Sequence, residues 1–94
     1  MTVLRVLNES DLNVTELSKL YGVSRQTIYT WLSGGHPQSN TYGARMQTVI
    51  TAALINAIER RVLPLGSMDK GKRRDRIARM AVTCQNLRPS AGRV

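Results

Sequence analysis

The outward face of one short segment, residues 24–33, carries side chains that can hydrogen-bond to the edges of DNA bases. Within this segment Ile28, Trp31 and Leu32 recur at spacings of three and four residues, as on the buried side of a helix. The other side of the same helix would present Arg25, Gln26, Tyr29, Thr30 and Ser33. A glutamine amide can donate and accept at once on adenine, and an arginine can donate to guanine. We therefore expect Gln26 to read a base, Arg25 to contact guanine or a phosphate, and Tyr29 and Thr30 to touch a thymine methyl or the backbone.

A second short helix is expected just before this one, joined to it by a tight turn. Asn13 can cap its start, and Glu16, three residues later, can reach back to the backbone N–H of Asn13. Gly22 follows the apolar residues Leu17, Leu20 and Tyr21, at the point where a chain leaving a helix often needs a positive φ. Ser24 then caps the segment that carries the polar face. Free N–H groups at the start of the first helix, near Thr15, are suited to a phosphate, and Ser24 and Ser33 are further expected phosphate contacts.

This stretch resembles the helix-turn-helix of Cro and lambda-repressor-like regulators over residues 13–35. The resemblance rests on the residues Leu17, Gly22, Val23, Ser24, Thr27, Ile28 and Trp31. Two features depart from the family pattern: Ser18 stands where alanine is usual, and Leu32-Ser33-Gly34-Gly35 follows Trp31. The resemblance implies a DNA-binding transcriptional regulator of phage or bacterial type that acts as a homodimer on two half-sites. It also implies that the segment after residue 33 runs beside the DNA backbone, where Ser39, Asn40 and Tyr42 would contact phosphates unless the segment is a plain connector.

The positive charge of the chain is concentrated in its last third. The formal net charge is +8, from 14 basic and 6 acidic residues. Residues 1–59 sum to zero, because four basic and four acidic residues cancel, and residues 60–94 hold the remaining ten basic residues against Asp69 and Asp75. Such an asymmetry favours a polyanionic partner near this region, although a charge run is often only a solvated face. We expect phosphate contacts from Lys70, Lys72, Arg73 and Arg74.

The apolar pattern predicts an all-α fold, a small helical domain with the helix-turn-helix, a long central helix and a basic C-terminal helix. A short helix is expected over residues 2–9, for which a strand is the alternative, and a long one over 42–62, ended by Pro64. Its expected apolar stripe is Met46, Val49, Ile50, Ala53, Leu54, Ala57, Ile58 and Val62. The last helix should span 72–87, with Asp69 as its cap and Cys84 on its buried side. Residues 1–88 are expected to form one domain, and residues 89–94 a disordered tail.

The sequence lacks the residues that a disulfide, a metal site or a catalytic centre would need. The single cysteine excludes an internal disulfide, and His36 has no partners at metal-ligand spacing. No nucleophile–base set or carboxylate pair is evident. We therefore expect no enzyme activity, metal, cofactor or small-molecule substrate. No signal peptide or membrane-spanning run is evident, so we expect a cytoplasmic protein of a bacterial host that makes no membrane contact.

Three functions compete on these grounds. The favoured one is a sequence-specific double-stranded DNA-binding regulator, with residues 24–33 in the major groove. An excisionase-like architectural factor, which bends DNA, would carry similar features. A helical protein-interaction module such as an antirepressor would instead present the basic helix to an acidic partner.

Overall fold

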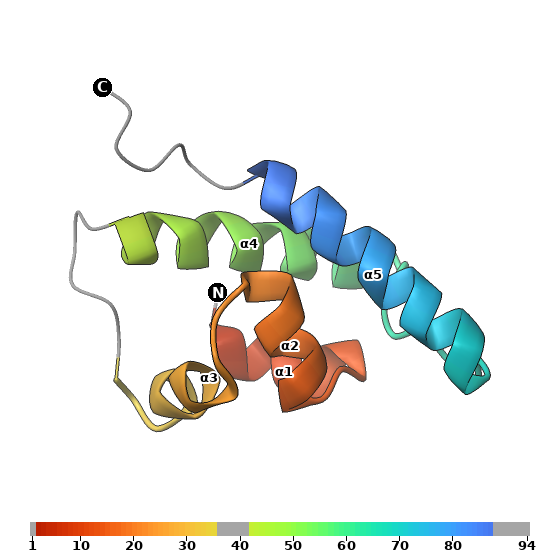
Figure 1. Ribbon diagram of the computed structural model, residues 1–94, viewed down its shortest axis with the longest axis horizontal. Coiled ribbons are helices and arrows are strands. Elements are labelled where there is room, and N and C mark those ends of the chain that lie inside the picture. The colour runs from red at the N-terminus through yellow and green to blue at the C-terminus, as the bar shows by residue number, and fades with distance from the viewer. Residues whose placement is uncertain (1, 36–41, 88–94) are drawn as a thin grey trace.

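The computed structural model describes residues 2–35 and 42–87, and these residues form five helices (Figure 1). They are α1 (Val3–Ser10), α2 (Val14–Tyr21), α3 (Arg25–Leu32), α4 (Tyr42–Glu59) and α5 (Lys70–Leu87). In Figure 1, α1 and α2 occupy the middle, α3 lies at the lower left, and α5 runs diagonally along the right. The all-α prediction is confirmed for the described residues. Ser39, Asn40 and the expected tail lie outside them.

The first helix is a helix and not a strand, as expected. Thr2 caps α1 with its side chain, which accepts from the N–H of Arg5 at 3.1 Å. Val3 and Val6 are buried, whereas Leu4 is half exposed. The helix ends at Asp11, whose φ of 61° is a left-handed value that aspartate tolerates better than most residues. The buried hydroxyl of Ser10 accepts from the N–H of Leu12 at 3.2 Å, so this sharp turn is hydrogen-bonded from within.

The long helix α4 ends earlier than the sequence predicts. Its last residue is Glu59, and the chain then turns through Arg61, which has a φ of 63°. The N–H groups of Arg61 and Val62 donate to the carbonyls of Ile58 and Ala57, at 3.1 and 2.9 Å, as at many helix C-termini. The prediction that Pro64 ends the helix is therefore wrong. Val62, a member of the expected apolar stripe, lies beyond the helix and is 47% exposed.

The buried side of α4 is also turned relative to the expected stripe. Met46, Ile50 and Leu54 are buried as predicted, but Thr51 and Ile55 are buried as well, and Val49 and Ala53 are only partly covered. Thr51 is accommodated because its hydroxyl hydrogen-bonds with the hydroxyl of Tyr21 at 2.6 Å. Burial raises the pKa of Tyr21 to about 12, which keeps this phenol neutral.

Helix α5 begins at Lys70, two residues before its expected start. Asp69 caps it as predicted: its carboxylate accepts from the N–H of Lys72 at 2.9 Å. Ile77 and Cys84 are buried, and Met80 and Ala81 are partly buried against the core. Val82 and Leu87, near the end of the helix, remain exposed.

One hydrophobic core joins all five helices. Its fully buried side chains are centred on α2, where Leu17, Leu20 and Tyr21 have no measurable exposure. Helix α2 is therefore the central element, with α3 packed on one flank and α5 on another. Any surface built from α3 and α5 is positioned through α2.

Candidate nucleic-acid interface

The polar face expected on residues 24–33 is present on α3. Ile28 and Trp31 are buried and fix the rotation of the helix about its axis. Arg25, Gln26, Tyr29 and Thr30 are consequently exposed, with Tyr29 at 57%. No carboxylate lies on this helix, and the sequence contains no Asp or Glu between Glu16 and Glu59. The exposed face of α3 can thus approach an anion without local repulsion.

The turn between α2 and α3 is held by backbone geometry and by caps at both helices. Gly22 has a φ of 69°, and its N–H and that of Val23 both donate to the Ser18 carbonyl, at 2.8 and 3.0 Å. The Ser24 hydroxyl accepts from the N–H of Thr27 at 3.2 Å and starts α3. Tyr21 and Trp31 pack edge to face, with ring centroids 5.4 Å apart. These contacts fix α3 relative to α2, and with it the backbone that carries the exposed side chains of α3.

The hydroxyl groups of Ser24, Thr30 and Ser33, all expected at the interface, already make hydrogen bonds to the backbone of α3. Thr30 Oγ1 donates to the Gln26 carbonyl at 3.0 Å, and Ser33 Oγ donates to the Tyr29 carbonyl at 2.9 Å. A phosphate oxygen can only accept, and each hydroxyl has one proton to donate. Ser33 would have to give up its bond within the helix to hold a phosphate. Ser24 keeps its cap and remains exposed.

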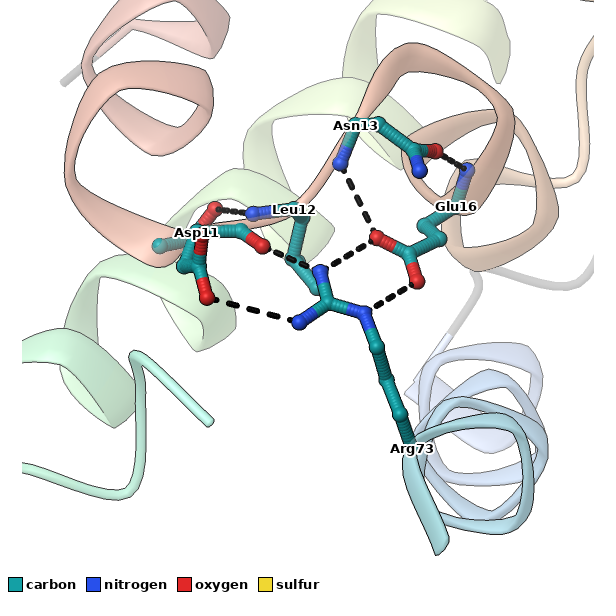
Figure 2. A network of polar contacts seen from close by, with 6 residues as sticks. Asp11, Leu12, Asn13, Glu16 and Arg73 are labelled. Carbon is teal, nitrogen blue, oxygen red and sulfur yellow. Dashed lines mark hydrogen bonds and ion pairs between the residues drawn. The ribbon is translucent and has the colours of Figure 1, made fainter. Parts of the chain in front are cut away.

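Arg73, one of the residues expected to contact phosphate, is paired with two carboxylates of the protein. Its guanidinium lies between Glu16, in the first turn of α2, and Asp11, just after α1, and contacts both (Figure 2). Nε and Nη2 each donate to a carboxylate oxygen of Glu16 at 2.7 Å. Nη1 lies 3.4 Å from the carboxylate of Asp11, and Nη2 also donates to the Asp11 carbonyl. These bonds take up four of the five N–H donors of Arg73, so the guanidinium serves mainly to join α5 to α2, and its predicted phosphate contact stays a prediction.

The same contacts place Glu16 at the centre of a small network. Its Oε1 accepts from the N–H of Asn13 at 3.0 Å, and the Asn13 side chain accepts from the N–H of Glu16 at 2.8 Å. The predicted capping box is confirmed. Hydrogen bonds from Arg73 hold the pKa of Glu16 below its ordinary value, against an opposing effect of burial. One carboxylate thus caps α2 and fastens α5 to it.

The other basic residues at the start of α5 remain available. Lys70, Lys72 and Arg74 are exposed, and none of them has an ion-pair partner within residues 2–35 and 42–87. Like charges at a helix N-terminus oppose its dipole. Here Asp69 and the pairing of Arg73 offset part of that repulsion.

A groove of about 500 Å³ lies between α2 and α5. Its α2 wall includes Asn13, Thr15 and Lys19, and its α5 wall includes Lys70 and Arg74. Thr15 is exposed, and its side chain makes no hydrogen bond within the described residues. Sequence reasoning missed Lys19 and the partners of Arg73. The spacing of Lys70, Arg73, Arg74 and Ile77 does place all four on one side of a helix, and this was the available signal.

The described residues form neither a membrane-spanning helix nor a metal cluster. None of their helices is both long and apolar enough to cross a membrane. No group of three or more His, Cys, Asp or Glu side chains in this part of the chain lies close enough together to hold a metal ion. Comparisons with protein-family models, curated proteins and solved structures found no match for this chain.

Proposed function

We propose that the chain binds double-stranded DNA sequence-specifically and regulates transcription, in the manner of the Cro- and repressor-like proteins of phages and bacteria. Helix α3 lies in the major groove in this proposal. An α-helix with its side chains is about 10–12 Å across, which fits the major groove, about 12 Å wide. A protein-interaction module would not need a helix that fits this groove.

The observation that carries the proposal is the outward face of α3. It combines Arg25, Gln26 and Tyr29 on a helix that is capped, locked from behind by Ile28 and Trp31, and free of carboxylates. Base reading needs side chains that present hydrogen bonds in a fixed frame. The proposal gives Gln26 the main reading role, on adenine, and gives Arg25 guanine or a phosphate.

The first turn of α2 supplies the backbone contact in this proposal. The N–H groups of Val14 and Thr15 have no partner inside their own helix, as is usual for a first turn. They lie at the positive end of the helix dipole, which favours a phosphate oxygen. The Thr15 hydroxyl is a further donor at the same place.

The test is the substitution Gln26→Ala, measured on a duplex selected by the wild-type protein. We expect a loss of about 1–3 kcal/mol on that duplex, and a weaker preference at one base pair. Binding would be measured by fluorescence anisotropy on the selected duplex and on single-base variants of it.

Gln85→Ala is the matched control, because Gln85 is exposed near the end of α5, away from the first turn of α2. It should leave both affinity and base preference unchanged. Equal effects of the two substitutions, or no change of preference with Gln26→Ala, would remove Gln26 from the interface.

A further inference from the structure

We infer that the groove between α2 and α5 is a second contact strip, which holds backbone phosphates of the same duplex through Lys19, Lys70 and Arg74. The inference rests on the proposed DNA binding and extends it beyond the reach of α3. It also sorts the basic residues of α5 into those that face the duplex and those that do not.

The groove carries more positive than negative charge. Its lining contains four basic residues and one carboxylate, Glu16. Arg73 neutralises that carboxylate through two hydrogen bonds of 2.7 Å. Lys19, Lys70 and Arg74 are then left as exposed cations without ion-pair partners in the described part of the chain. The groove lining therefore has a net positive charge, and it contains no second carboxylate to balance these three cations.

The groove also lies next to the surface that the proposed function assigns to DNA. It opens beside Asn13 and Thr15, in the first turn of α2, where the proposal already places a phosphate. In Figure 1 this turn, α3 and the first turns of α5 all lie along the lower edge of the molecule. The ion pairs of Arg73 with Glu16 and Asp11 hold α5 against that turn (Figure 2). A duplex on α3 that reaches the start of α2 meets this groove next.

The spread of the cations favours a repeating anion over a small one. Lys70 and Arg74 are four residues apart on α5, a rise of about 6 Å along the helix axis. Lys19 lines the same groove from α2, and Ile77, Ala78 and Ala81 supply apolar lining from α5. A strand of phosphates can satisfy several separated cations together, and each phosphate contact releases bound counterions.

The opposite side of α5 provides the contrast. Lys72 and Arg79 are also exposed, but they line a different hollow, together with Met68, Asp75 and Arg76. Seven residues separate them, so they share one side of the helix, turned about half a revolution from Lys70 and Arg74. The inference predicts that these two cations do not touch the duplex.

The test compares Lys70→Gln/Arg74→Gln with Lys72→Gln/Arg79→Gln, which remove the same charge from the two sides of one helix. Affinity for the selected duplex is measured over a range of salt concentrations. The salt slope is the decrease of log K with log of the salt concentration, and loss of two phosphate contacts should reduce it by about 1.8. Between 50 and 200 mM salt, the fold-loss of affinity should therefore be roughly ten times smaller for the groove variant than for wild type. At the low-salt end it should bind correspondingly more weakly, whereas the control variant should keep the wild-type slope.

A methylphosphonate scan of the duplex then locates the contacts. Neutral linkages at the phosphates held by the groove should weaken binding by wild type, and should leave binding by the groove variant almost unchanged. Equal salt slopes for the two double variants, with wild type binding its duplex normally, would overturn the inference and leave the proposed function intact. Failure of wild type to bind any duplex would instead overturn both. Lys19→Gln should repeat the groove effect with about half the change in slope.

Discussion

At the scale of single residues, the pair formed by Arg73 and Glu16 has two consequences. It fastens α5 to the start of α2, since Arg73 is 57 residues away from Glu16 in sequence. It also neutralises the carboxylate that caps α2, and this carboxylate would otherwise repel a phosphate approaching the same turn. Side-chain exposures of 23% for Arg73 and 14% for Glu16 make this a partly buried pair.

Arg73→Ala should lower the free energy of unfolding by about 1–3 kcal/mol at neutral pH, because it leaves the carboxylate of Glu16 partly buried without its cation. The pKa of Glu16 is depressed in the folded state, so the stabilisation is present above its ordinary value of 4.5 and is lost as pH falls through the lower folded value. The gap between wild type and Arg73→Ala should therefore close under acid conditions. Urea unfolding at a series of pH values measures it.

Arg74→Ala is the control for this comparison, since Arg74 is the exposed neighbour without an ion pair among the described residues. It should change the free energy of unfolding by less than about 0.5 kcal/mol. A gap for Arg73→Ala that persists unchanged into acid would show that the ionised Glu16 is not the source of the stabilisation.

At the scale of elements, the corner between α2 and α3 depends on one backbone conformation. Gly22→Ala puts a Cβ on a residue with a φ of 69°, where a left-handed conformation costs about 1–2 kcal/mol. We expect the thermal unfolding midpoint to fall while helix content stays close to wild type, because the Gly22 N–H can still donate to Ser18. Circular dichroism during a thermal melt measures both quantities.

Gly71→Ala is the opposite case and serves as control. Gly71 lies in the first turn of α5, and a Cβ there would meet only the Asp69 carboxylate at 3.5 Å, an ordinary contact. Alanine should leave the midpoint unchanged or raise it, because glycine is the poorer helix former. If both substitutions lowered the midpoint alike, the positive φ of Gly22 would not be what holds the corner.

The elements also show how far sequence reasoning reaches. The caps at Asn13, Ser24 and Asp69, and the exposed face of α3, follow from local patterns and could be predicted. Periodicity could not give the partners of Arg73, because a contact across 57 residues depends on how α5 packs against α2. The end of α4 was misplaced for a related reason: Arg61 takes a left-handed turn that non-glycine residues rarely adopt.

At the scale of the whole molecule, neutral and basic parts meet on one central helix. Residues 1–59 carry no net charge, and the +8 of the chain comes from residues 60–94. Packing of α5 against α2 brings part of that charge to the start of α2, at the end of this helix opposite the turn to α3. In the proposed complex, α3 supplies sequence discrimination, and the α2–α5 groove supplies attraction that depends on salt.

Pairing of two copies remains a proposal at this scale, implied by the resemblance to Cro- and repressor-like proteins. The exposed Val82 and Leu87 of α5 are apolar side chains available for it. Two inverted half-sites in a selected duplex would be the signature of such a dimer.

Selection of duplexes from a random pool by the wild-type protein is the most direct measurement of whether α3 reads DNA. We predict enrichment of one defined sequence, and loss of the preference at one base pair when the selection is repeated with Gln26→Ala. Recovery of unenriched, random duplexes by correctly folded wild-type protein would contradict base reading by α3.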